Sequence, residues 1–379
     1  MIPLTFTSAV VQNERLLPGI HGLRGVAALA VVLYHLVHIG GIATPTVFNF
    51  IARDFGYSVH LFFILSAYSL MHSTNNGIDR PTWLADYFVK RFFRIAPLYY
   101  LMMFLLVAHS LVKGTHSITM TDVVLGLTLT FGFVAPFGFV WGGWSVGVEM
   151  IFYCVFPILL LLIKTRKSAL IFLVFSIVVS CALRSALHFY YQRADPNATY
   201  DWSYFAFPSN FCFFAMGIFA FRLNESRRKE ADALGAWIPL MAISIIGALL
   251  FLKPAGLAGY STRPDIAIWG IGLTALCAWQ AHRPSIAIAN HLFEFLGERS
   301  YSIYLVHMVI ILLAKDHLQR IRDWFFPAIG NYAYFLCAIA ALAAVLVTAE
   351  ITYRLIEVPG IRFGRRLVKR YHGSAGVSI

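Results

Sequence analysis

The chain has 379 residues, of which 59% are hydrophobic and 13% are charged, and its mean hydropathy is +0.72. An ordinary soluble domain carries roughly 25% charged residues, so the composition excludes a soluble protein and favours one that crosses a membrane many times. Lys and Arg exceed Asp and Glu by 30 to 18. Basic cytoplasmic loops explain this excess of +12 without a nucleic-acid partner.

The first apolar run, residues 23–42, contains two ionisable groups, Arg24 and His35. A spacing of eleven positions corresponds to roughly 1,100° of helix rotation, so both side chains lie on one face, about 16 Å apart along the axis. This separation predicts Arg24 at the cytoplasmic edge and His35 near the midplane. An ionisable group inside a span indicates a functional site. The alternative is a structural histidine that satisfies a buried carbonyl.

Ten further apolar runs follow, at residues 56–73, 95–112, 120–140, 143–163, 168–187, 204–221, 235–252, 265–281, 299–314 and 328–353. If all of them crossed, several basic loops would face outward, against the positive-inside rule. The run at 120–140 is rich in Gly and Pro, which suits a re-entrant or broken segment. If this run does not fully cross the membrane, the later runs reverse their direction, and about two-thirds of the Lys and Arg residues are cytoplasmic. The sequence therefore predicts an all-α polytopic membrane protein with about ten transmembrane helices and both termini in the cytoplasm.

Three segments are expected on this basis: a cytoplasmic N-terminal segment (1–22), a membrane domain (23–355) and a basic cytoplasmic tail (356–379). The five cysteines all lie in apolar runs, so no disulfide framework is expected. No metal site is expected either.

Basic residues gather before the run at 95–112, where VKRFFRIAPLYY contains Lys90, Arg91 and Arg94. Three cations at a helix entrance can bind a polyanionic phosphate group. The alternative is that they only orient the chain in the membrane.

Glu149 lies in WSVGVEMIFY, at a depth close to that of His35, and shares a helical face with Ser145 and Tyr153. A carboxylate there can orient an imidazole, hold its protonated form or act as a second base. The alternative is a structural ion pair with Arg184 or with a histidine.

Near the C-terminus, LGERSYSIYLVH places Ser300, Tyr304 and His307 on one helical face, which could line a cavity opposite His35. The alternative is that these groups join neighbouring helices. Glu350 is expected to pair with Arg354, four residues further along the last run.

Five motifs in this order resemble the acyltransferase 3 family of polytopic membrane acyltransferases, and the resemblance covers nearly the whole chain. The motifs are GIHGLRGVAALAVVLYH, GYSVHLFFILSAYSL, KRFFRIAPLYY, WSVGVEMIFY and LGERSYSIYLVH. His60 stands where many members have aspartate, and Ala67 stands where a glycine usually follows the serine. The resemblance does not extend to the esterase-like domain that some members carry, so the acceptor is expected to arrive through the membrane core or another protein.

The resemblance implies a role for each candidate residue. His35, Arg24 and Glu149 would be catalytic, while Arg91, Arg94 and Lys90 would bind acyl-CoA. The remaining candidates would line the acceptor site or its cavity: Ser66, His60, Ser145, Tyr153, Tyr304 and His307.

The implied reaction moves an acyl group, typically acetyl, from cytoplasmic acyl-CoA to a hydroxyl of a cell-surface glycan, a lipid-linked sugar or a related acceptor. Acyl-CoA would be a co-substrate, with no permanently bound cofactor. The expected location is a bacterial inner membrane, with the lipid bilayer and glycan-assembly proteins as partners and no nucleic acid. The alternative function is a proton-coupled secondary transporter that uses His35, Glu149 and His307 as a relay.

Overall fold

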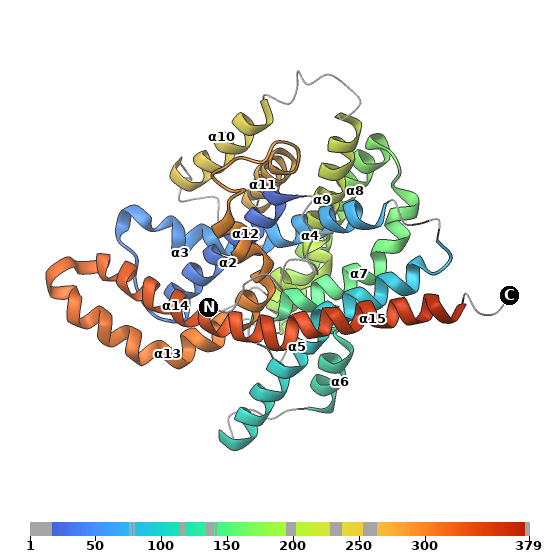
Figure 1. Cartoon of the computed structure of the whole chain (residues 1–379). Coiled ribbons are helices and arrows are strands. Elements are labelled where there is room, and N and C mark those ends of the chain that lie inside the picture. The colour runs from blue at the N-terminus through green and yellow to red at the C-terminus, as the bar shows by residue number, and fades with distance from the viewer. Residues whose placement is uncertain are drawn as a thin grey trace.

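The computed structural model describes residues 17–75, 78, 80–113, 119–133, 140, 142–194, 202–227, 237–252 and 264–375, and every regular element in these ranges is helical (Figure 1). The predicted all-α class is therefore confirmed for this part of the chain. The first half contains α2 (Pro18–His38), η1 (Thr46–Phe48), α3 (Phe50–Asp54), η2 (Phe55–Tyr57), α4 (Ser58–Thr74), α5 (Trp83–Lys113), α6 (Met120–Thr128), η3 (Phe131–Phe133) and α7 (Trp144–Leu162). The second half contains α8 (Arg166–Ala194), η4 (Trp202–Phe205), α9 (Phe207–Arg227), α10 (Trp237–Leu252), α11 (Pro264–His282), α12 (His291–Glu298), α13 (Ser300–Ile329), η6 (Gly330–Tyr332), α14 (Ala333–Thr352), η7 (Tyr353–Glu357, a π-helix) and α15 (Val358–Ala375).

Six helical stretches of the described chain are long and apolar enough to cross a membrane: Pro18–His38, Trp83–Val112, Trp144–Leu162, Arg166–Ala194, Ser203–Glu225 and Ser300–Tyr371. The last stretch contains both α13 and α14. A shorter apolar helix covers Ile238–Leu250. The protein is therefore a multi-pass membrane protein, whereas the total of about ten crossings stays a prediction.

The run at 120–140, predicted to be re-entrant or broken, contains a helix that ends well before the run does. Thr119 begins α6 with a capping box, in which its side chain accepts from the Asp122 backbone N–H and the Asp122 carboxylate accepts from the Thr119 backbone N–H. The helix ends after Thr128, because Leu129 adopts a left-handed conformation with φ of 57°. Nine residues extend about 14 Å, roughly half of the hydrocarbon thickness, so α6 alone cannot cross the bilayer.

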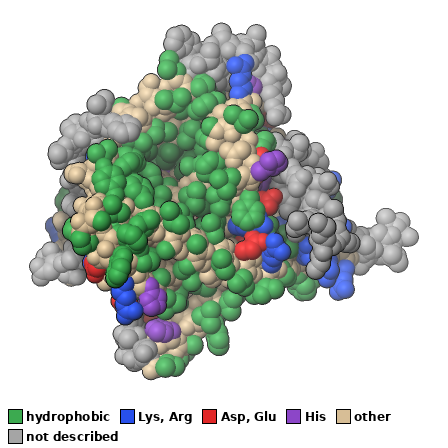
Figure 2. All heavy atoms as spheres, turned by 60° about the vertical axis from the view of Figure 1, so that its left-hand side comes forward, with side chains coloured by type: hydrophobic (Ala, Val, Ile, Leu, Met, Phe, Trp, Pro, Cys, Tyr) green, Lys and Arg blue, Asp and Glu red, His purple; other side chains and the backbone are tan. Residues whose placement is uncertain are grey.

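Large apolar side chains cover much of the outer surface, as expected for a protein whose solvent is lipid. Phe104 is 67% exposed, and Leu162 and Leu313 are each 70% exposed. Figure 2 shows hydrophobic side chains over the centre of one face, with charged and His side chains toward its margins. The exposed apolar surface agrees with a membrane location.

Helix α2 lies in the interior and packs against α4, α11, α12 and α13. Pro18 occupies its first turn, where the missing N–H breaks no helical hydrogen bond. Glycines allow the close approach of α12 and the segment before it: a Cβ atom at Gly22 would overlap the carbonyl oxygen of Ile288, and one at Gly297 would overlap that of His21. This packing anchors the helix that carries His35.

Replacing Gly297 with alanine is expected to destabilise the protein by about 2 kcal/mol or more, because the added methyl group meets backbone that cannot rotate away. A lower melting temperature and a loss of monodisperse protein in detergent would report this change. Gly247→Ala in α10 is the matched control, since a Cβ atom added there would have nothing within 4 Å. Equal melting temperatures for the two variants would contradict the prediction.

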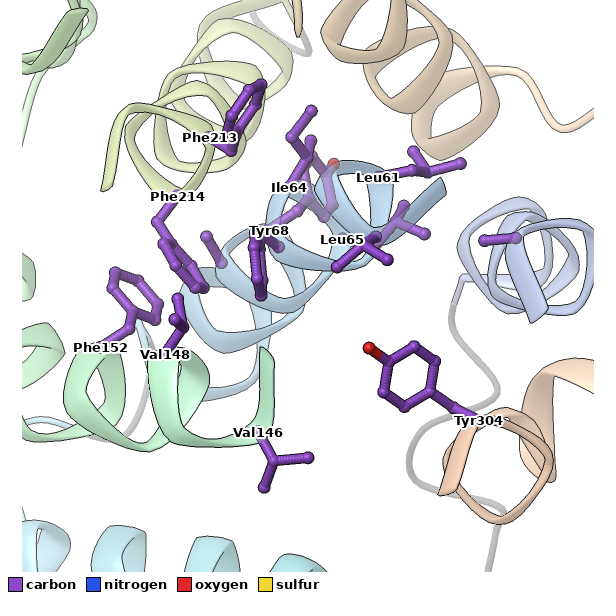
Figure 3. Packing of buried hydrophobic residues seen from close by; sticks show 14 of the residues in the cluster. Leu61, Ile64, Leu65, Tyr68, Val146, Val148, Phe152, Phe213, Phe214 and Tyr304 are labelled. Carbon is purple, nitrogen blue, oxygen red and sulfur yellow. The ribbon is translucent and has the colours of Figure 1, made fainter. Parts of the chain in front are cut away.

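Helices α4, α7 and α9 form an aromatic core beside α2 (Figure 3). The rings of Phe152 and Phe214 stack with centroids 4.0 Å apart, and Phe63 lies 4.8 Å from Phe214. Because aromatic packing of this kind tolerates little rearrangement, it holds the facing sides of α4 and α7 in a defined register.

Residues 356–375 of the expected basic tail continue the last span as helix. Gly360 and Gly364 of α15 lie against Phe93 of α5, so α15 packs on the helix that carries the basic motif. The expected ion pair between Glu350 and Arg354 is confirmed, and Arg299 also pairs with Glu350.

Candidate functional site

His35 lies near the end of α2 and forms the centre of the candidate site. Its Nδ1 atom lies 3.0 Å from the carbonyl oxygen of Val31, one turn earlier. The side chain is half-buried, so part of the imidazole can be reached from outside the protein core. Arg24 is also half-buried, three turns earlier on the same helix.

His307 of α13 is the side-chain partner of His35. Its Nε2 atom lies 3.1 Å from Nδ1 of His35, and the ring centroids are 4.9 Å apart. Its Nδ1 atom lies 2.5 Å from the carbonyl oxygen of Tyr304. His307 is completely buried, at 0% exposure. The side chain expected to line a cavity opposite His35 therefore contacts the His35 ring directly, and of the two rings only that of His35 is partly exposed.

The two backbone carbonyls determine which ring nitrogens carry protons. A carbonyl oxygen only accepts hydrogen bonds, so Nδ1 of neutral His307 donates to Tyr304 and its Nε2 is left as an acceptor. The carbonyl of Val31 and the Nε2 atom of His307 both require a donor at Nδ1 of His35. In neutral His35 the lone pair is then on Nε2, the nitrogen that faces away from both partners.

Glu149 of α7 contacts α4 rather than His35. Its Oε1 atom accepts hydrogen bonds from the hydroxyls of Ser66 and Tyr153, both at 2.5 Å. Among the described residues Glu149 forms no hydrogen bond with His35, and the expectation that it orients or neutralises the imidazole stays a prediction. Glu149 forms no ion pair with Arg184 in the described chain, and the Arg184 guanidinium lies 5.6 Å from the ring centroid of Tyr204.

Tyr304 and Ser145 occupy the region between the histidine pair and the carboxylate. The Tyr304 hydroxyl accepts from Ser145 Oγ at 2.7 Å and donates to the carbonyl of Gly142 at 2.8 Å. In Figure 3 the Tyr304 side chain extends from α13 toward α4 and α7. Ser145 and Glu149 share a face of α7, as predicted, but they bind different partners: Ser145 binds Tyr304 of α13, and Glu149 binds Ser66 of α4.

Two arginines from different helices bind one face of α4. Arg24 of α2 donates to Ser69 Oγ at 3.2 Å, and Arg91 of α5 donates to Ser73 Oγ at 3.4 Å. The Arg91 guanidinium also lies 6.0 Å from the ring centroid of Tyr153. With Ser66, these serines form what we call the α4 serine stripe: Ser66, Ser69 and Ser73.

The sequence analysis missed two members of the α4 serine stripe, Ser69 and Ser73. Their spacing from Ser66, at i+3 and i+7, is the signal that could have found them, because it places all three hydroxyls on one helical face. The stripe connects the carboxylate of Glu149 with the guanidinium groups of Arg24 and Arg91.

The three cations of the basic motif have different surroundings. Lys90 is exposed, whereas Arg91 faces the α4 serine stripe. Arg94 interacts electrostatically with the buried carboxylate of Glu357 in η7, which also accepts from Ser302 Oγ at 2.7 Å. All three lie within α5, which begins at Trp83, rather than before the helix as the apolar run suggested.

His60 lies apart from the other candidates, at 1% exposure. Its ring packs beside four aromatic rings, with centroids at 4.2 Å (Phe213), 5.4 Å (Tyr204), 5.7 Å (Tyr57) and 6.3 Å (Phe63). The buried position indicates a packing role within the aromatic core.

Metal binding finds no support in the part of the chain that the structure describes. No group of three or more His, Cys, Asp or Glu side chains there is arranged to hold an ion. The chemistry available at the site is that of imidazole, carboxylate, hydroxyl and guanidinium groups.

Comparison with known proteins gives relatives that are named acyltransferases. A family model described as an acyltransferase domain, that of acyltransferase 3, matches residues 17–350. A peptidoglycan O-acetyltransferase of Listeria monocytogenes is 26% identical over 382 residues, which cover 92% of this chain and 56% of the relative. A Bacillus subtilis protein to which the same name is assigned is 26% identical over 397 residues, covering 94% and 57%.

A third relative, assigned as an acetyltransferase of Acidianus two-tailed virus, is 27% identical over 293 residues, which cover 77% of this chain and 83% of the viral protein. The chain spans slightly more than half the length of the two bacterial relatives. No solved structure matches the chain. Because the family model covers most of the sequence, including His35 and His307, the chain belongs to the acyltransferase 3 family.

Proposed function

We propose that the protein is a membrane O-acyltransferase that moves an acetyl group from cytoplasmic acyl-CoA to a hydroxyl of a cell-surface glycan or lipid-linked sugar. Family membership supports acyl transfer, and the names of the bacterial relatives support a glycan acceptor. The family match gives no support to the transporter alternative. The proposed location is a bacterial inner membrane, with both termini in the cytoplasm.

One observation carries the catalytic part of the proposal: Nδ1 of the half-buried His35 ring lies within hydrogen-bond distance of both the Val31 carbonyl and Nε2 of His307, an arrangement that leaves the lone pair on Nε2. The Val31 carbonyl and His307 both require the proton on Nδ1. Nε2 can then remove the proton of an acceptor hydroxyl during attack on the thioester, a contribution of roughly 10²- to 10⁴-fold. The same atom could instead attack the thioester itself and form an acyl-histidine intermediate.

The donor is proposed to bind along the α4 serine stripe. Arg91 and Arg24 supply two positive charges on that face of α4, and both form hydrogen bonds that a phosphate oxygen could replace. Arg91 is the better candidate, because it belongs to the basic motif and contacts an exposed serine. Arg94, which the resemblance also assigned to the donor, is engaged with Glu357.

The acceptor is proposed to reach His35 from the opposite end of the site. Tyr304 and Ser145 bind each other there, and Glu149 is held by Ser66 and Tyr153. In this arrangement Glu149 acts on the α4 serine stripe rather than on the imidazole. No bound cofactor is proposed, since acyl-CoA itself supplies the reactive thioester.

The function can be tested with purified protein in lipid nanodiscs, acetyl-CoA labelled in the acetyl group, and a panel of peptidoglycan fragments and lipid-linked sugars. We expect label in a base-labile ester on at least one acceptor. Protein with His35 replaced by alanine provides the background. Uptake of labelled material by proteoliposomes without any covalent transfer would contradict the proposal and restore the transporter alternative.

A further inference from the structure

We propose that His307 is a positioning residue that holds the reactive tautomer of His35 and stabilises the imidazolium formed during the reaction. This inference rests on the proposed function. It assigns to a buried histidine the role that the sequence had suggested for Glu149. Where the resemblance implied acceptor or cavity lining, the structure instead places His307 behind His35, at 0% exposure.

The first argument is the direction of the hydrogen bonds. The carbonyl of Tyr304 lies 2.5 Å from Nδ1 of His307 and can only accept, so His307 presents a lone pair at Nε2. That atom is 3.1 Å from Nδ1 of His35. His307 can therefore accept a hydrogen bond from His35 but cannot donate one to it while it remains neutral.

The second argument is the environment of the positive charge. An imidazolium that forms in a buried site needs a hydrogen-bond acceptor, because desolvation is otherwise unfavourable. Glu149 accepts from Ser66 and Tyr153, and the acceptors beside Nδ1 of His35 in the described chain are His307 and the Val31 carbonyl. His307 is the side chain among them, so it can be changed by substitution.

The third argument is that the position of His307 is itself fixed. The Tyr304 side chain is bound to Ser145 in the first turn of α7 and to the carbonyl of Gly142, which precedes that helix. The centroids of the Tyr304 and His307 rings are 5.6 Å apart. These contacts hold the α13 turn whose carbonyl orients His307, so three helices determine the orientation of one imidazole pair.

The proton transfers balance as follows. The hydroxyl oxygen of the acceptor attacks the thioester carbonyl while its proton moves to Nε2 of His35, and the resulting imidazolium donates from Nδ1 to His307. The carbon–sulfur bond then breaks, the acetyl group stays on the acceptor oxygen as an ester, and the CoA thiolate takes the proton from Nε2. His35 returns to its neutral form, and His307 remains neutral throughout, with its own Nδ1 proton donated to the Tyr304 carbonyl.

Two substitutions at position 307 test this inference. His307→Leu keeps most of the side-chain volume but removes the acceptor, so kcat is expected to fall roughly 10²-fold or more. The KM values for acetyl-CoA and for the glycan acceptor should change less than about threefold, because His307 is buried and touches neither substrate. His307→Gln retains an acceptor oxygen near the Nε2 position and should recover at least about tenfold of the kcat lost in the leucine variant.

Controls separate positioning from a structural role. His317→Leu removes an exposed histidine from the same helix and should leave kcat unchanged. Melting temperatures of the two variants at position 307 should be similar, while their kcat values differ. Equal kcat values for the leucine and glutamine variants, or a leucine variant with full activity, would overturn the role of His307. Absence of covalent transfer by the unsubstituted protein would instead overturn the proposed function, so the two failures are distinguishable.

Discussion

Replacing His35 with alanine is expected to lower acetyl transfer by roughly 10²- to 10⁴-fold, to the background of the assay. The variant loses the lone pair at Nε2 that either route requires, whether His35 acts as general base or forms an acyl-histidine. The protein should still fold, because the side chain is only half-buried and its hydrogen bonds involve one carbonyl and one neighbouring ring. Label transfer from acetyl-CoA measures the activity, and the melting temperature in detergent reports the fold.

His38→Ala is the matched control for this experiment. His38 lies one turn further along α2, is exposed, and its Nε2 atom lies 2.8 Å from the carbonyl of Ala52. Its removal should reduce transfer by less than about threefold, since it has no contact with His307. Full activity of the His35 variant, or equal losses in both variants, would show that the reactive group lies elsewhere.

Reversing the charge of Arg91, by Arg91→Glu, is expected to raise the KM for acetyl-CoA at least about tenfold with a smaller effect on kcat. A guanidinium that binds phosphate contributes a charge-assisted hydrogen bond, and glutamate would repel the same group. Because Arg91 contacts Ser73 at the end of the α4 serine stripe and not the histidine pair, the chemical step should be affected less than binding. Initial rates over a range of acetyl-CoA concentrations separate the two parameters.

Lys90→Glu makes the same change of charge one position away and serves as the control. Lys90 is exposed on α5, so its reversal should change the KM for acetyl-CoA less than Arg91→Glu does. Arg94→Gln should instead lower the melting temperature, because it leaves the Glu357 carboxylate buried with less compensating charge. Similar KM values in the Arg91 and Lys90 variants would return these cations to a role in membrane orientation.

Much of the helical framework could be predicted from the sequence. Apolar runs long enough to cross a bilayer are a local property, and each expected run corresponds to a helix except at 120–140. There the Gly-rich and Pro-rich composition indicated a break, and the helix ends at Leu129. The helix ends were less predictable: α5 starts at Trp83, twelve residues before the apolar run at 95–112, because its first turns are amphipathic.

The partners of the site residues could not be predicted in the same way. Helical periodicity placed Ser145, Glu149 and Tyr153 on one face, and that face does exist. Periodicity does not show which neighbour meets each turn, however. Ser145 meets Tyr304 of α13, whereas Glu149 and Tyr153 meet Ser66 of α4.

The sequence by itself determined that this protein is helical and that it lies in a membrane, because hydropathy depends only on the local chain. Helical rise along each span also predicted similar depths for His35 and Glu149. Only the tertiary structure decided that His35 binds His307 and that Glu149 binds the α4 serine stripe. The physical reason is that depth describes position along a helix axis, whereas contact also requires the rotation of each helix and the identity of its neighbours. Those are set by glycine contacts around α2 and by the aromatic core between α4, α7 and α9.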